Sequence, residues 1–118
     1  MSITEYRETI DYTWVIARQL DRILSIYSEI SLDAPLPKLK RLYVAIRGLC
    51  VASSPFLTCN ELSKVLEHLR SGLSRKALDL LDKVLSEALK ELNKKGLLIR
   101  YYELARGEYG ADSEQDYP

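Results

Sequence analysis

The sequence predicts a mostly α-helical fold that ends in a small β-hairpin. Apolar residues recur every three or four positions along most of the chain, and residues 1–34 contain neither Gly nor Pro, which indicates helices. The run LLIRYYEL, residues 97–104, is rich in branched and aromatic residues and precedes the glycine-bearing ARGEYG, which indicates a strand and a turn. At 118 residues the chain has room for one domain with a modest core and one further element.

Residues 3–30 are expected to form one long helix. Apolar and small residues alternate at spacings of three and four along it, as in a heptad seam, and further apolar residues widen that surface. We therefore expect residues 1–35 to be a dimerisation element that forms a homodimer, or a docking element for another protein. The alternative is a helix packed wholly inside its own monomer. The dimer would use Tyr6, Ile10, Trp14, Leu20, Leu24 and Tyr27.

The remaining elements follow a linker near residues 31–36, where Pro35 and Pro37 interrupt the helical pattern. A helix is expected over 38–52, and a second helix begins in a capping box at Thr58 and Glu61. Gly72 breaks that helix, and a third one runs to Gly96, either continuous or broken near residue 80. Helices, a strand and a hairpin in this order are typical of a winged helix-turn-helix, here over residues 36–112, with a loose tail at 113–118.

Charge is unevenly distributed, although the net charge of the chain is zero. Residues 36–76 hold eight basic side chains against two acidic ones, a net charge of +6, and both ends of the chain are acidic. Such a basic block is the electrostatic pattern of a nucleic-acid surface. We therefore expect the third helix and the hairpin to bind double-stranded DNA. The residues expected to do so are Arg75, Lys76, Lys83, Ser86, Lys90, Lys94, Arg106 and Tyr109.

Two other functions remain open. The same fold can serve protein–protein assembly, for which the neutral charge, Glu87 and Glu108 are suited, and the chain can be a non-catalytic subunit of a larger nucleoprotein complex. The interleaved charges of the third helix are also typical of an ordinary solvent-exposed face.

Three stretches resemble the C-terminal winged-helix domain of archaeal origin-recognition initiator proteins. They are LPKLKRLYVAI at 36–46, the spacing from Thr58 to KEL at 90–92, and GLL with ARGEYG. As a DNA-binding protein, the chain is expected to be a transcriptional regulator or a replication or partition accessory factor. The resemblance covers residues 36–112. It implies that Arg106, Gly107, Tyr109 and Gly110 form the wing, with Lys83, Ser86, Glu87 and Lys90 on the outward side of the recognition helix. Glu108 stands where that family has a second arginine.

Other classes of function find little support in the sequence. His68 is the only histidine, and Cys50 and Cys59 lie too far apart in sequence for a chelating pair, so we expect no metal, no cofactor and no catalysis. The sequence leaves a disulfide between the two cysteines open. No apolar run reaches the ~18 residues of a membrane span, and the acidic N-terminus lacks the features of a signal peptide, so a cytoplasmic location is expected.

Overall fold

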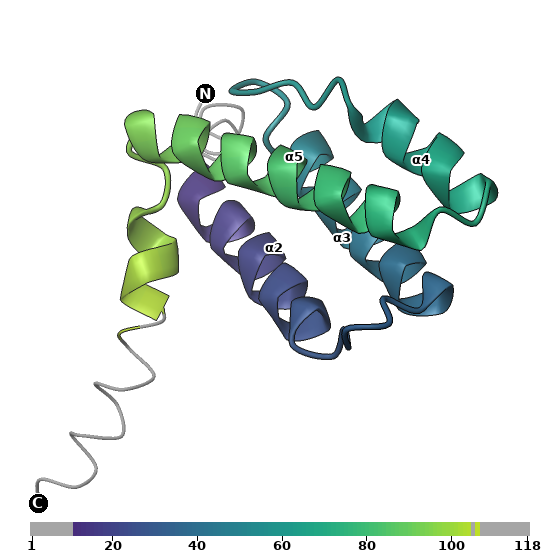
Figure 1. Cartoon of the computed structure of the whole chain (residues 1–118). Coiled ribbons are helices and arrows are strands. Elements are labelled where there is room, and N and C mark those ends of the chain that lie inside the picture. Colours follow the sequence, from purple (N-terminus) through teal and green to yellow (C-terminus); the bar gives the residue numbers. More distant parts are fainter. Residues whose placement is uncertain (1–10, 105, 107–118) are drawn as a thin grey trace, which may run out of the picture.

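The computed structural model describes residues 11–104 and 106, and within them every regular element is a helix. The four long helices are α2 (Tyr12–Tyr27), α3 (Leu36–Ala52), α4 (Leu62–Arg70) and α5 (Ser74–Lys94), and a shorter one spans 99–104. Helix α3 contacts each of the other three long helices. Helices α4 and α5 also pack against each other beside it (Figure 1). One hydrophobic core joins all of them.

Helix α2 belongs to this core. Asp11 caps its N-terminus by accepting a hydrogen bond from the Thr13 backbone N–H at 3.1 Å. Five of its residues are buried and the helix ends at Tyr27, three residues before the expected end. The expected single helix over residues 3–30 is therefore wrong, because Asp11 is not helical and α2 begins at Tyr12. Residues 3–10 lie outside the described residues. The buried residues of α2 are Ile16, Ala17, Leu20, Ile23 and Ile26.

Helix α3 is the most enclosed element. It begins at Leu36, so Pro37 stands in its first turn, where a missing backbone N–H costs nothing. Six residues on its inner side are buried, and five of them are fully buried. These six are Leu39, Leu42, Ala45, Ile46, Leu49 and Cys50.

Glycines end the next two helices, as the sequence predicts. Gly72 follows α4 with a φ of 74°, and Gly96 follows α5 with a φ of 70°, a left-handed conformation that costs glycine little. In both places the residue after the glycine donates back to a carbonyl of the last turn, Leu73 to His68 and Leu97 to Leu92, each at 2.9 Å. Both ends are therefore Schellman motifs, and α5 continues past residue 80 without a break.

The expected capping box at α4 is not formed. The helix begins at Leu62 with Glu61 in the N-cap position, and no side chain caps it. The Glu61 carboxylate instead lies 3.5 Å from the Lys83 ammonium on α5. A tertiary ion pair has replaced the local hydrogen bonds that the sequence pattern predicts.

The predicted strand at 97–104 is wrong, and with it the predicted β-hairpin and winged-helix fold. Residues 99–104 are helical, and no strand occurs within residues 11–104 and 106. The Schellman turn at Gly96 redirects the chain, after which Leu98 is buried and Tyr101 and Leu104 are half-buried. Spacings of three suit a helix and not a strand. The rest of the expected hairpin, Gly107 to Gly110, lies outside the described residues.

Candidate nucleic-acid interface

The outward side of α5 carries a row of lysines. Lys76, Lys83 and Lys90 are each seven residues apart, and Lys94 continues the row one turn later. All four side chains are exposed. At a helical rise of about 1.5 Å per residue, successive members of the first three lie about 10 Å apart on the same side of the helix. Ser86 is exposed near the middle of this helix.

Tertiary contacts divide the residues expected to bind DNA. The Arg75 guanidinium donates a hydrogen bond to the Leu32 carbonyl at 3.2 Å, which ties it to the loop before α3. Lys83 is the partner of Glu61. Lys76, Lys90 and Lys94 form no ion pair with any residue in the described part of the chain. These three ammonium groups are therefore exposed and carry no ion pair within the described part of the chain.

The two hairpin residues expected to bind DNA are not part of the lysine row on α5. Arg106 is exposed but belongs to the C-terminal helical segment and not to α5, and Tyr109 lies outside the described residues. Acidic side chains lie close to the lysines on α5 itself, where Asp79, Asp82 and Glu87 are exposed. The structure thus brings together the expected α5 residues, and it adds acids that dilute their charge.

A groove runs along one side of α5 against the segment before α4. Its cavity volume is about 760 Å³. Phe56 and Leu57 form its apolar wall with Val84 and Ala88 of α5. The polar lining residues include Thr58, Asn60, Glu61, Glu87, Lys90, Glu91 and Lys94. Two members of the lysine row therefore also border this groove.

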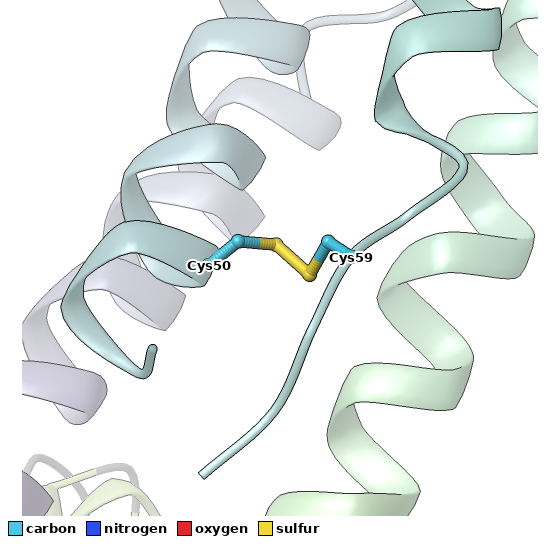
Figure 2. The surroundings of a disulfide bond; sticks show 2 residues. All are labelled: Cys50 and Cys59. Carbon is cyan, nitrogen blue, oxygen red and sulfur yellow. A yellow bond between two sulfur atoms is a disulfide. The ribbon is translucent and has the colours of Figure 1, made fainter. Parts of the chain in front are cut away.

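A disulfide between Cys50 and Cys59 holds the outer wall of the groove (Figure 2). Cys50 lies in the last turns of α3, and Cys59 lies in the extended segment that runs toward α4. Their Cα atoms are 6.1 Å apart. Because both sulfurs are bonded to each other, neither thiol is available as a metal ligand or nucleophile. Sequence periodicity alone gives no signal for this pairing.

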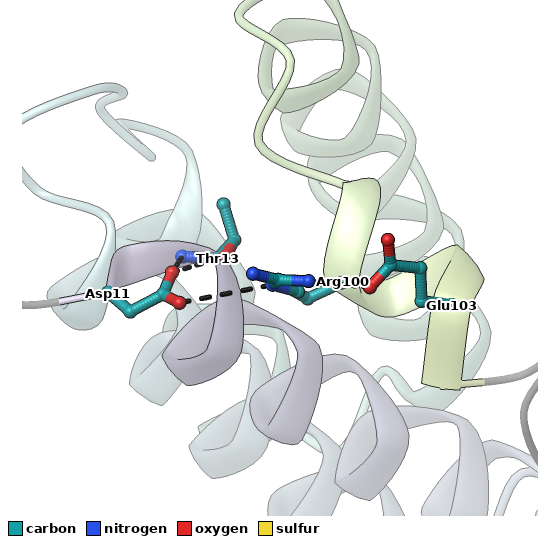
Figure 3. A network of polar contacts seen from close by, with 4 residues as sticks. All are labelled: Asp11, Thr13, Arg100 and Glu103. Carbon is teal, nitrogen blue, oxygen red and sulfur yellow. Dashed lines mark hydrogen bonds and ion pairs between the residues drawn. The ribbon is translucent and has the colours of Figure 1, made fainter.

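Arg100 joins the C-terminal helical segment to the start of α2 (Figure 3). It forms an ion pair with Glu103 at 2.7 Å and a longer one with Asp11 at 3.9 Å. Its guanidinium also lies 5.4 Å from the centre of the Trp14 ring, a cation–π contact. These contacts explain why Trp14, at 41% exposure, is not simply a free apolar surface.

The pKa of Asp11 is lowered, chiefly by the hydrogen bond that the Thr13 hydroxyl donates to it, with smaller contributions from the backbone N–H groups of Thr13 and Trp14 and the charge of Arg100. A lowered pKa means that the stabilising contribution of Asp11 is complete above the unfolded-state pKa. It is lost as the pH falls through the lower folded-state value.

Replacing Thr13 by valine is expected to raise the pKa of Asp11 toward its ordinary value, because the main donor to the carboxylate is removed. Arg100→Gln removes a smaller cause and is expected to raise the pKa less. Carboxyl-carbon NMR titration of both variants measures the two shifts. A larger shift in Arg100→Gln would contradict this ranking of causes.

The residues expected to form a dimer seam occupy different environments. Leu20 is 2% exposed and lies in the core, whereas Leu24 is 44% exposed. Tyr27 is half-buried against the core. Tyr6 and Ile10 lie outside the described residues. Among the four described positions, Trp14 and Leu24 are thus the exposed ones, and the Trp14 ring is in contact with Arg100.

Within the described residues, no group of three or more His, Cys, Asp or Glu side chains is arranged to hold a metal ion. No helix among them is both long and apolar enough to cross a membrane. No family model, curated protein or solved structure matches this chain.

Proposed function

We propose that this protein binds double-stranded DNA through the lysine-bearing side of α5. The main support for this proposal is that Lys76, Lys83, Lys90 and Lys94 are all exposed on one side of α5. That helix directly follows a short helix and a tight turn at Gly72, the order of elements in a helix-turn-helix. The proposal does not depend on a wing.

The chemistry of the row favours phosphate contacts over base recognition. An ammonium group is a compact charge on a flexible stem and binds phosphate without reading the base. A row of four lysines can neutralise at most about four phosphates, which predicts a slope of log affinity against log salt no steeper than about −3.6. Asp79 and Glu87 lie on the same helix and repel phosphate, so the affinity is expected to be modest and salt-sensitive.

Fluorescence anisotropy with a labelled duplex, titrated across salt, tests the proposal. The variant Lys76→Gln/Lys90→Gln removes two exposed charges that have no ion-pair partner in the described part of the chain. It is expected to weaken binding and to flatten the salt slope by about two units, since each phosphate contact contributes about 0.9.

The matched control is Arg18→Gln/Arg22→Gln, which removes the same amount of charge from exposed positions on α2. It is expected to leave the salt slope unchanged. Equal losses in both variants would mean that the net charge, and not α5, governs binding.

A second candidate is a protein-assembly role for the same surface. It is favoured by the carboxylates on α5 and by the groove that Phe56, Leu57 and Val84 line beside them. The absence of duplex binding at low salt would favour this role over DNA binding.

A further inference from the structure

The solvent-facing side of α3 carries an ordered row of residues that the DNA-binding proposal does not use. The row consists of Pro37, Lys40, Val44, Arg47 and Val51, and we call it the α3 stripe. Its members follow one another at alternating spacings of three and four, so they lie along a single side of the helix. All five are exposed, with Val44 at 53% and Val51 at 65%.

The α3 stripe lies opposite the buried side of the same helix. Leu42, Ile46 and Leu49 on that buried side are fully enclosed in the core that α3 shares with α5. The stripe and the lysine row of α5 are therefore separate surfaces. Figure 1 shows α3 lying behind α5, with α2 alongside it.

The surroundings of the stripe are basic. Helix α3 contains Lys38, Lys40, Arg41 and Arg47 and no acidic residue. Helix α2 runs beside it, since a Cβ atom built on Gly48 would lie 3.1 Å from the Gln19 side-chain oxygen, and the exposed Arg22 follows Gln19 by one turn. The loop between α2 and α3 holds two acids, of which Glu29 is already paired with Arg41 at 3.1 Å and Asp33 is exposed.

We propose that the α3 stripe binds an acidic amphipathic helix of a partner protein. Val44 and Val51 lie seven positions apart, and each has a cation, Lys40 or Arg47, next to it in the row. This pattern is complementary to a helix that has apolar residues at heptad spacing with carboxylates beside them. From Pro37 to Val51 the stripe extends about 21 Å, which is enough for roughly four turns of a docked helix.

The charge and composition of the α3 stripe favour an acidic helix over three other binding partners. A second copy of the chain docked through the same side would bring Lys40 and Arg47 of both copies together without acids between them. A DNA duplex would leave Val44 and Val51 facing phosphate and sugar, where their apolar surface gains nothing. A bilayer surface would be met by larger anchors than valine, and the stripe holds no aromatic residue.

The test is an amide-resolved NMR titration of the whole chain with two synthetic three-heptad peptides. Both carry leucine at the core heptad positions. One carries glutamate at the flanking positions, and the other carries lysine there. We expect the glutamate peptide to shift the amides of the α3 stripe and the lysine peptide to leave them unmoved. Equal shifts with both peptides, or none with either, would overturn the proposal.

Two sets of variants sharpen the test, and both change exposed residues, so the melting temperature serves as the control for folding. Val44→Ser/Val51→Ser is expected to weaken binding of the glutamate peptide by about tenfold or more. Lys40→Glu/Arg47→Glu is expected to reverse the preference, so that the lysine peptide binds instead. Unchanged peptide preference in this charge-reversed variant would exclude recognition through the α3 stripe.

A duplex titration separates this surface from the DNA-binding one. Shifts of the Val44 and Val51 amides with duplex and not with the glutamate peptide would assign the α3 stripe to nucleic acid and overturn the proposal. Shifts confined to α5 with duplex would be consistent with the peptide-binding proposal. A failure of α5 to bind duplex would not change the result expected with the glutamate peptide.

Discussion

Leu20→Ala is expected to lower the free energy of unfolding by about 2–5 kcal/mol, the usual cost of truncating an enclosed leucine. Leu20 is 2% exposed and belongs to the core that α2 shares with α3. Leu24 lies one turn later on the same helix and is 44% exposed, so Leu24→Ala is expected to cost less than about 1 kcal/mol. Denaturant titration of the two variants measures the difference.

This pair of variants also separates folding from association. If α2 forms a dimer through its exposed apolar residues, Leu24→Ala is expected to shift the mass measured by light scattering toward the monomer without loss of stability. Leu20→Ala then acts on folding alone. Equal destabilisation by both substitutions would contradict the packing of α2 described here.

Reduction of the Cys50–Cys59 disulfide by a dithiol is expected to destabilise the protein by about 2.7 kcal/mol. The value follows from the entropy of closing a loop of about ten residues in the unfolded chain. The sequence separation of the two cysteines is nine. Denaturant titration with and without the reductant measures the change, and mass spectrometry after alkylation confirms the redox state.

The control for this prediction is the Cys50→Ala/Cys59→Ala variant. It is expected to lose a similar amount of stability and to become insensitive to the reductant. Finding two reactive thiols in the folded, unreduced protein would contradict the disulfide. Loss of the bond also frees the segment that forms the outer wall of the groove, so reduction is expected to broaden the NMR signals of residues 54–60 before those of α5.

Much of the helical framework is readable in the sequence, because it depends on local patterns. The buried sides of α3 and α5 follow the spacing of their leucines, and Gly72 and Gly96 end helices as their freedom at positive φ predicts. The prolines indicate the helix boundaries less directly. Pro37 lies in the first turn of α3 and does not interrupt a helix.

The C-terminal segment shows where local patterns fail. Residues 97–104 combine branched and aromatic residues that favour strands, and the same residues place Leu98, Tyr101 and Leu104 at helical spacing. The contacts of Arg100 with Asp11 and Trp14 favour the helix, and they join positions nearly ninety residues apart in sequence. A short-range pattern carries no information about such contacts.

The candidate interface can be predicted only in part, because a local pattern gives the exposure of a side chain but not its tertiary contacts. Exposure of Lys76, Lys90 and Lys94 follows from the amphipathic pattern of α5. The contacts that hold Arg75 and Lys83 come from Leu32 and Glu61, distant in sequence, and could not be read from the helix itself. The disulfide cannot be read from the sequence, because only the folded chain brings the two Cα atoms to 6.1 Å.

The most direct test of the proposed function is an NMR titration of the isotope-labelled protein with duplex DNA at low salt. We expect amide shifts concentrated on the exposed side of α5 around Lys76, Lys83 and Lys90, which disappear as salt is raised. Shifts spread evenly over the surface, or an unchanged spectrum at a large excess of duplex, would contradict it.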